Sequence, residues 1–281
     1  MQQFRRIGVF LHDSPADDEA LAFASRFAEL ANSESVVCIH VREPGVPGEP
    51  PLDAAGFQRE TLKKLPPAVA DRTKVEVHTG AGVPAILRAA RDLALDLVVV
   101  GRRLPSEQIG IGSAFTRLAR KCPCTVLVVP NYARVHLSRM LVPVDFSEHS
   151  RLALEQALRI ARAGGQPRPE VVVQSVCSVH YGYRKTARSL YEAASELEQL
   201  TRTRLQEFVR GVDAHGVNLE TVAICAEQVE TAIHELAAVR KMDLIVIGSR
   251  GSGWTAAVLL GATAERILVT AALPVLIVKE K

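Results

Sequence analysis

An internal repeat is the feature of this sequence that most constrains its fold. Three apolar segments of the first half recur in the second half, in the same order and with similar flanking residues. The matched segments are 7–12 with 140–145, 96–101 with 243–248, and 124–129 with 273–278. A repeat of about 140 residues has the size of one ordinary domain. The sequence therefore predicts two tandem domains, 1–135 and 136–281, with the join at 130–138.

Each copy alternates short runs of Val, Ile and Leu with amphipathic stretches, which predicts alternating strands and helices. The expected strands are 6–12, 35–41, 73–79, 96–101 and 125–129 in the first copy, and 139–145, 170–176, 218–224, 242–248 and 274–279 in the second. The expected helices of the second copy are 148–163, 186–212, 229–240 and 261–270. Nearly continuous apolar strands are typical of parallel sheets covered on both faces. We therefore expect an α/β fold of two tandem doubly wound, Rossmann-like domains, each with a five-stranded parallel sheet.

Composition limits the classes of function. Hydrophobic residues make up 48% of the chain and charged residues 23%, which is enough for a buried core. No apolar run approaches the roughly 20 residues that span a bilayer. Five cysteines, an odd number in mostly apolar surroundings, indicate a reducing compartment. A net charge of +3 gives no concentrated positive field for nucleic acid. The sequence thus favours a cytoplasmic protein that engages neither membrane nor nucleic acid.

Candidate binding residues follow the strands of the second copy. Ligands bind open parallel sheets beyond the carboxyl ends of the strands, where the strand order reverses. The candidates are Asp145 after the first expected strand, Gly248, Arg250, Gly251 and Gly253 after the fourth, and Gly261, Ala262 and Thr263 at the start of the last helix. Glycines let a phosphate approach backbone N–H groups, and a helix N-terminus favours an anion. Tight strand-to-helix turns are the alternative explanation, and the glycine order matches neither a Walker loop nor Gly-x-Gly-x-x-Gly.

The arrangement as a whole resembles the universal stress protein family. The resemblance is carried by residues 141–147 (LVPVDFS), by Gly248-x-x-Gly251 and, nine residues later, by Gly261. It covers nearly the entire chain, as two tandem domains of that family. The resemblance implies an ATP-binding stress-response protein without strong enzymatic activity, with ATP bound alone or together with Mg²⁺.

The resemblance also implies roles for individual residues of the second domain. Asp145, which follows Pro143 in the matched segment, would hold the nucleoside, and the backbone of Val176 would meet adenine. Gly248 would approach the ribose and phosphates, and Arg250 would add a mobile cation. Gly251, Gly261 and the amides after Gly261 would surround the phosphates.

Two departures from the family pattern bear on binding. Ala262 stands where the signature has Ser or Thr, so one phosphate-binding hydroxyl is missing unless Thr263 replaces it. Losing one hydrogen bond to a charged group costs about 1.5–3 kcal/mol. In the first copy, His12 takes the place of the aspartate, and Leu104-Pro105 removes the second glycine and one N–H donor. We therefore expect nucleotide binding in the second domain and a structural or regulatory role for the first.

Other residue groups have both a functional and a structural interpretation. His12, Asp13 and His40 lie at the ends of neighbouring expected strands, where three ligands for a metal would meet. Strand-end histidines are more often hydrogen-bonded loop residues, so no metal site is expected. Cys122 and Cys124 have one intervening residue and no matching second pair, which favours packing.

The loops of the second copy offer two further groups. Cys177 and His180 suggest a nucleophile and a base, but the sequence orients neither, so no catalytic pair is expected. The aromatic and basic segment 181–185 is interpreted as a plain loop, with a lid over the strand end as the alternative. Trp254, inside the glycine-rich loop, is expected to pack locally.

Three functions are compatible with these residues. The leading hypothesis is a module that binds ATP in its second domain and changes its contacts with an unidentified protein partner. The alternatives are slow ATP hydrolysis or adenylyl transfer, with Asp145 or Glu265 holding Mg²⁺, and a nucleotide-free scaffold. The resemblance also implies domains that pair through the last strand, so segments 126–129 and 275–278 are expected to be adjacent in an internal pseudo-dimer. The sequence does not decide whether two chains form a homodimer.

Overall fold

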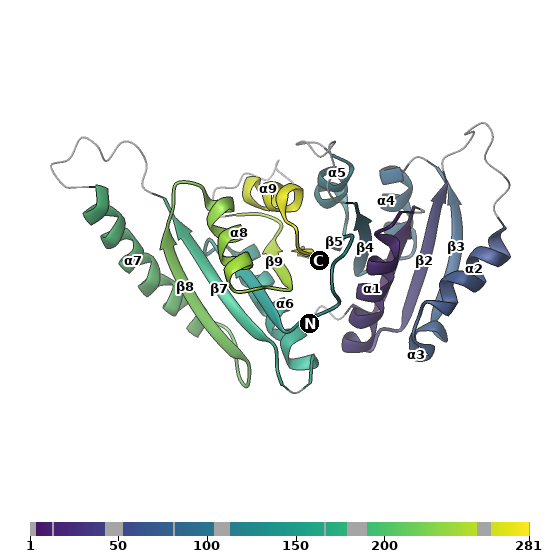
Figure 1. Ribbon diagram of the computed structural model, residues 1–281, viewed down its shortest axis with the longest axis horizontal. Coiled ribbons are helices and arrows are strands. Elements are labelled where there is room, and N and C mark those ends of the chain that lie inside the picture. The colour runs from purple at the N-terminus through teal and green to yellow at the C-terminus, as the bar shows by residue number, and fades with distance from the viewer. Residues whose placement is uncertain are drawn as a thin grey trace. The chain divides into compact units, whose positions relative to one another are not determined.

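The computed structural model describes residues 4–12, 14–42, 53–80, 82–103, 113–165, 167–178, 190–251 and 260–280. The chain forms two compact units (Figure 1). Unit 1 comprises Met1–Val135 together with Ala272–Lys281, and unit 2 comprises His136–Ala271. Each unit combines a mostly parallel sheet with helices packed on it, so the predicted α/β class is confirmed.

Unit 1 is built around a sheet with the strand order β3-β2-β1-β4-β5-β10. Its elements are β1 (Arg6–Leu11), α1 (Asp17–Ala31), β2 (Ser35–Arg42), α2 (Ala54–Lys63), α3 (Pro67–Ala70), β3 (Thr73–Thr79), α4 (Gly82–Asp92), β4 (Leu97–Arg102), α5 (Ala114–Lys121), β5 (Thr125–Pro130) and β10 (Val275–Val278). The first five strands pair in parallel, and their order reverses between β1 and β4. Every residue of β4 and β5 is buried, which explains why these segments are mostly apolar, with Arg102 and Thr125 as the polar exceptions at their ends.

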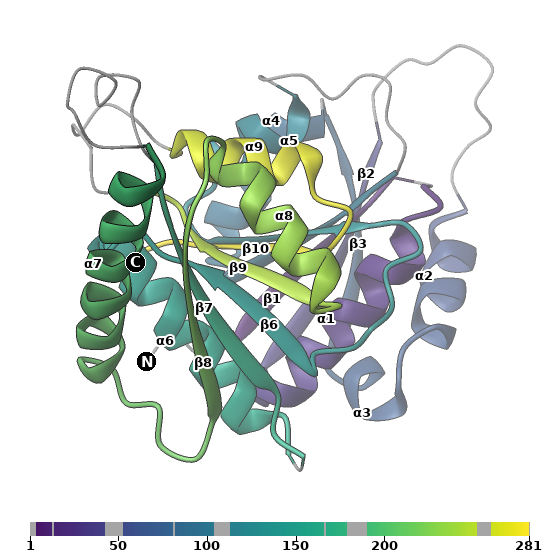
Figure 2. The same cartoon turned by 60° about the vertical axis from the view of Figure 1, so that its left-hand side comes forward.

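In unit 2 the strand order is β8-β7-β6-β9, which corresponds to β3-β2-β1-β4 of unit 1. The order reverses between β6 and β9. The elements of unit 2 are β6 (Arg139–Pro143), α6 (Glu148–Ala163), β7 (Glu170–Cys177), α7 (Leu190–Arg210), β8 (Asn218–Cys225), α8 (Val229–Val239), β9 (Leu244–Gly248) and α9 (Ala262–Thr270). Figure 2 shows α8 in front of this sheet and α6 behind it. Helix α6 begins where the sequence predicts, because Ser147 accepts a hydrogen bond from the Ser150 amide and caps the helix.

The last strand departs from a purely parallel arrangement. β10 pairs antiparallel with β5, with Leu276 opposite Leu127 and Ile277 opposite Val126. The expected adjacency of segments 126–129 and 275–278 is thereby confirmed. By repeat, β10 belongs to the second copy, yet its hydrogen bonds and its buried side chains place it in the compact unit formed by the first copy. The boundary in the sequence and the boundary in space therefore differ by the last ten residues, 272–281.

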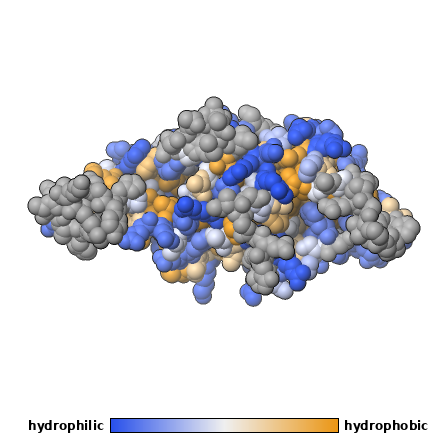
Figure 3. All heavy atoms as spheres, turned by 90° about the horizontal axis from the view of Figure 1, so that it is seen from above, coloured by the Kyte–Doolittle hydropathy of each residue, from blue (hydrophilic) through white to orange (hydrophobic). Residues whose placement is uncertain are grey.

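The surface mixes polar and apolar side chains. Figure 3 shows hydrophilic and hydrophobic residues interspersed over the described part of the face that it presents. Within the described residues, no helix is both long enough and apolar enough to cross a membrane.

Candidate functional site

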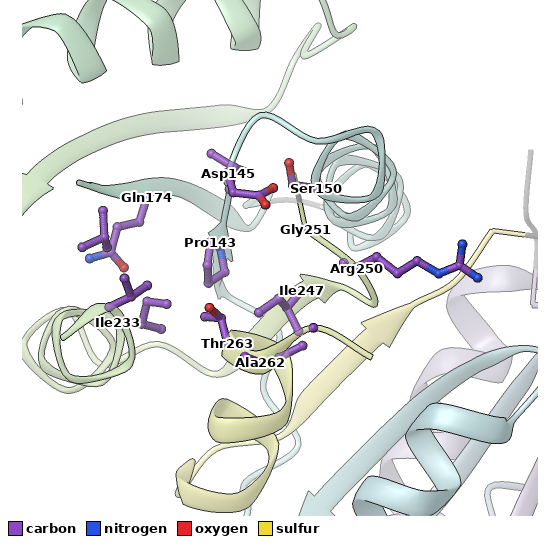
Figure 4. Close-up of a pocket in the computed structure, with 16 residues that line it drawn as sticks. Pro143, Asp145, Ser150, Gln174, Ile233, Ile247, Arg250, Gly251, Ala262 and Thr263 are labelled. Carbon is purple, nitrogen blue, oxygen red and sulfur yellow. The ribbon is translucent and has the colours of Figure 1, made fainter. Parts of the chain in front are cut away.

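A cavity of about 300 Å³ lies within unit 2, at the carboxyl ends of β6 and β9 and the start of α9 (Figure 4). The strand order reverses between β6 and β9, so the cavity occupies the point at which open parallel sheets bind ligands. All of the sequence-predicted site residues that the structure describes line it. They are Pro143, Asp145, Val176, Gly248, Arg250, Gly251, Gly261, Ala262 and Thr263. Gly253 lies outside the described residues, as does Trp254.

Pro143 explains why the sheet opens at this point. Strands β6 and β9 pair only at Met140 with Leu244 and at Leu141 with Ile245. The next residue, Val144, donates its amide to Gln174 on β7, so the backbone nitrogen of Pro143 faces the other neighbour, β9. Proline has no N–H to donate. The ladder therefore stops, and the two strands separate around the cavity.

At the position of unit 1 that corresponds to Pro143, the residue is not proline and the strand pairing continues. The repeat aligns Phe10 with Pro143, and pairing between β1 and β4 continues through Phe10 opposite Val100. Phe10 is opposite Ile39 on β2 as Pro143 is opposite Gln174 on β7. Both unit 1 side chains are fully buried. At the positions equivalent to Pro143 and Gln174, unit 1 thus has a buried phenyl ring and a buried aliphatic side chain.

Asp145 is held at the mouth of the cavity by its own loop. Its Oδ1 accepts hydrogen bonds from the amide of Ser147 at 3.1 Å and from the hydroxyl of the same residue at 2.6 Å. The side chain is exposed, and Oδ2 faces Gly251, where an added Cβ would lie 2.6 Å away. The carboxylate is therefore placed by short-range bonds, with one edge directed toward the glycine loop.

Phe146 fixes the loop that carries Asp145 and is a residue that the sequence did not single out. Its φ of 66° lies in the left-handed region, which non-glycine residues adopt only when the surroundings impose it. Its ring packs edge-on against Phe208, with centroids 5.7 Å apart, and the guanidinium of Arg204 lies 4.3 Å from its centroid. Both partners come from α7, so this helix stabilises a strained residue next to the cavity.

We expect Phe146→Ala to lower the free energy of unfolding by about 1–2 kcal/mol, because it removes the ring contacts but keeps the unfavourable φ. Phe146→Gly also loses the ring but relieves the backbone strain, so it should be the more stable of the two by roughly 0.5–1 kcal/mol. Urea unfolding monitored by circular dichroism measures both values. An alanine variant as stable as the glycine variant would show that φ at this residue carries no strain.

The glycines of the β9 loop serve different purposes. A Cβ at Gly248 would lie 2.6 Å from the backbone carbon and oxygen of His149, so packing of β9 against the start of α6 already requires glycine. Gly101 is the equivalent residue of unit 1, and its Cβ would lie 2.5 Å from the Ala16 oxygen. The predicted role of Gly248 in ligand approach is therefore not needed to explain this glycine. At Gly251 the nearest atom is only an exposed carboxylate oxygen of Asp145.

The N-terminus of α9 forms one wall of the cavity. Gly261 is its N-cap and supplies no side-chain hydrogen bond, and its own amide donates to the oxygen of Ser249 at 2.8 Å. The first amides of a helix have no partner within the helix, and Ala262, Thr263 and Ala264, which carry these amides in α9, all line the cavity. In Figure 4 the Thr263 hydroxyl points to the side of Pro143. Thr263 thus offers the hydroxyl that Ala262 lacks.

Arg250 is the residue that the sequence suggested as a mobile cation. The residue lines the cavity, but Figure 4 shows its guanidinium extending away from Asp145 and Thr263.

The apolar half of the cavity contains residues that sequence reasoning missed. Val229 and Ile233 of α8 and Ile247 of β9 face Val176, and Ser150 contributes the start of α6. Gln174, two residues before Val176 on the same face of β7, completes this wall and is 1% exposed. A glutamine within the apolar segment EVVVQSVC was the signal available in the sequence.

The competing groups do not form sites among the described residues. No set of three His, Cys, Asp or Glu side chains is placed to hold a metal there, and Asp13 lies outside them. The ring of His40 packs against Phe57, with centroids 4.9 Å apart. Glu265, the second candidate for Mg²⁺, is 7% exposed and does not line the cavity.

The five cysteines are free thiols. Cys122 and Cys124 are buried, with their sulfurs 3.6 Å apart, and Cys38 is fully buried, which raises its pKa to about 12. The thiol of Cys177 donates to the Ile224 oxygen at 3.4 Å. Burial, together with the hydrogen bond that its thiol donates to Cys177, raises the pKa of Cys225 to about 12. His180 and the segment 181–185 lie outside the described residues.

A doubly wound sheet with a cavity at its strand-order reversal defines a Rossmann-like α/β domain. Comparison with known proteins gives the family. The model of the universal stress protein family matches residues 3–130 and 136–279. The chain therefore belongs to the universal stress protein family, with two tandem domains.

Individual relatives agree with this assignment. The chain is 32% identical over 148 residues to a protein named universal stress protein MJ0531 from Methanocaldococcus jannaschii, a match that covers 50% of this chain and 82% of that protein. The fold of this chain is similar to that of a universal stress protein from Archaeoglobus fulgidus, with a TM-score of 0.67 and 20% identity. The match covers 99% of this chain and 100% of that chain. A structure described as a putative universal stress protein from Pseudomonas aeruginosa has a TM-score of 0.65, 16% identity and coverage of 99% and 94%.

Proposed function

We propose that unit 2 binds ATP in the cavity at the ends of β6 and β9, and that the protein acts as a nucleotide-dependent binding or signalling module. The observation that carries this proposal is the N-terminus of α9, which has no side-chain cap and opens onto a cavity. Such a terminus combines N–H donors with a partial positive charge and favours phosphate. The cavity volume of about 300 Å³ lies at the lower end of the range for small-molecule sites.

Three groups of described residues would contact the phosphates, the ribose and the base of ATP. The amides that begin α9 and the Thr263 hydroxyl would hold the phosphates, with Gly251 leaving room for them. The carboxylate of Asp145 at the mouth would accept hydrogen bonds from the ribose hydroxyls. Val176 and Ile233 supply apolar surface of the kind on which a base packs. Asp145 is the one carboxylate among the described lining residues, so a Mg²⁺ ion would have to be held mainly by the phosphates.

Nucleotide binding would act on partners by changing the surface around the cavity rather than by turnover. The protein partner, a homodimer, an internal pseudo-dimer and a cytoplasmic location stay predictions.

Mass spectrometry of small molecules released from the freshly purified full chain tests the proposal, together with calorimetric titration of ATP. We expect an adenine nucleotide in the released material, or binding of added ATP with thermal stabilisation of about 2.7 kcal/mol when ATP is present at 100 times its Kd. If the protein neither carries nor takes up adenine nucleotide at millimolar concentration, the proposal is wrong.

Pro143→Phe gives a variant that places the unit 1 residue in unit 2. We expect the phenyl ring to fill part of the cavity and lower the affinity for ATP at least tenfold, because the base and the ring compete for one volume. The melting temperature without ligand shows whether the variant is folded and as stable as the wild type. Unchanged affinity in a folded variant would place the nucleotide elsewhere.

A further inference from the structure

Gln174 is a buried polar side chain of the cavity whose oxygen has no hydrogen-bond donor among the described residues. It is 1% exposed, and its Nε2 donates to the backbone oxygen of Ala232 in α8 at 3.1 Å. Its Oε1 is also buried, and no donor among the described residues reaches it. Figure 4 shows this oxygen on the side toward Pro143 and Thr263, with the nitrogen turned away from them.

The contact with Ala232 fixes which end of the amide faces the cavity. Rotating the amide by 180° would place Oε1 against a carbonyl oxygen, so two acceptors would face one another. The orientation with nitrogen toward α8 is therefore favoured by the protein alone. The cavity is left with an acceptor at this position, surrounded by Val176, Ile233 and other apolar residues.

The fold does not need a glutamine at this position. The repeat places Ile39 there in unit 1, opposite Phe10, and that isoleucine is fully buried in the same doubly wound sheet. A buried acceptor without a donor is unfavourable, whereas an aliphatic residue would satisfy the packing. No described residue supplies a hydrogen-bond donor to the Oε1 of Gln174, so a donor on a ligand in the cavity would satisfy this oxygen.

We propose that Gln174 is the residue that selects the base, with its Oε1 accepting a hydrogen bond from an exocyclic amino group. The inference rests on the proposed function, since it concerns a nucleotide in the same cavity. It assigns the ligand class more narrowly: the preferred base carries an N–H donor, as adenine does, where hypoxanthine carries a carbonyl oxygen. An oxygen there would face the Oε1 of Gln174, and acceptor would meet acceptor.

Three triphosphates that differ at one position of the purine ring test the assignment. Their affinities are measured by calorimetry for the wild-type chain, for Gln174→Ile and for Gln174→Met, with ATP, inosine triphosphate and purine riboside triphosphate as probes. We expect the wild type to bind ATP roughly tenfold or more tightly than either analogue, since one lacks the amino group and the other replaces it with oxygen. Both variants should bind ATP more weakly and distinguish the three probes by less than threefold.

Thermal melting without ligand separates base selection from a structural role. If Gln174 acted only as a structural residue, its substitution would lower the melting temperature and leave the ratio of affinities unchanged. If it selects the base, Gln174→Ile removes a buried acceptor, so the unliganded chain should melt at the wild-type temperature or above it while the affinity ratio falls. Gln174→Met, which is unbranched and similar in length, gives the same readout should isoleucine fit poorly.

The outcomes distinguish this inference from the proposed function. Failure of the wild type to bind any of the three triphosphates overturns both. Binding of ATP with equal affinity for the inosine analogue, or discrimination that survives in both variants, overturns the role of Gln174 and leaves nucleotide binding in place. Loss of discrimination in both variants, with melting temperature retained, supports the assignment.

Discussion

Gly251→Val is expected to lower the affinity for ATP by about a hundredfold while leaving unit 2 nearly as stable as in the wild type. A Cβ at this residue would lie 2.6 Å from Oδ2 of Asp145. That oxygen is the end of an exposed side chain, so it can move away at little cost to the fold. The displaced carboxylate would lose its position at the cavity mouth, and the branched side chain would cover the space in which a phosphate approaches the backbone.

Calorimetric titration of ATP and thermal melting of the same samples measure the two effects separately. Gly82→Ala is the matched control, because a Cβ there meets nothing within 4 Å and the residue begins α4 in unit 1. The control should bind ATP like the wild type. Wild-type affinity in Gly251→Val would remove the glycine loop from the binding site.

Gly248→Ala, unlike Gly251→Val, is expected to cause a large loss of stability. Its Cβ would lie 2.6 Å from two backbone atoms of His149, and backbone cannot rotate away as a side chain can. We expect the free energy of unfolding to fall by about 3 kcal/mol or more, with a melting temperature lower by roughly 6–12 °C. Gly101→Ala should do the same in unit 1, because its Cβ would lie 2.5 Å from the Ala16 oxygen.

Chemical denaturation of the two variants tests whether this glycine is a packing residue in both repeats. A loss of ATP affinity at Gly248→Ala, measured below the melting transition, would be secondary to the movement of β9 against α6. If both variants melt like Gly82→Ala, the close approach of the strand to the helix is not a constraint, and ligand approach would again be the best explanation for Gly248.

Much of the fold could be predicted because periodicity and repeats are local properties. Helix α6 has the predicted bounds, 148–163, and the strands agree within a few residues, since apolar runs and a serine cap are visible in sequence. The partner of β10 was predicted from the resemblance to the family, because a repeat by itself shows the ancestry of a segment and not its hydrogen-bond partners. The antiparallel register of Leu276 with Leu127 depends on where the chain returns in space.

Some residues of the candidate site were predicted from the sequence, and others were found only in the structure. Asp145, Gly251 and Gly261 were predicted because they follow expected strands or begin the last helix, where parallel sheets bind ligands, and because their spacing resembles the family pattern. Gln174 was missed because it lies inside a strand, and only the contact with Ala232 shows that its oxygen lacks a donor from the described residues. Phe146 was missed because a left-handed φ at an aromatic residue has no signature in sequence.

The sequence by itself determined that this chain has two copies of a doubly wound α/β unit, and it predicted that the second copy matches the nucleotide motif more fully than the first. These features follow from residue order, which sets periodicity and strand-end chemistry. The tertiary structure decided that Pro143 opens the sheet where Phe10 fills it, and that Gly248 serves packing while Gly251 leaves space. Such distinctions depend on distances between residues far apart in the chain, and those distances exist only once the chain has folded.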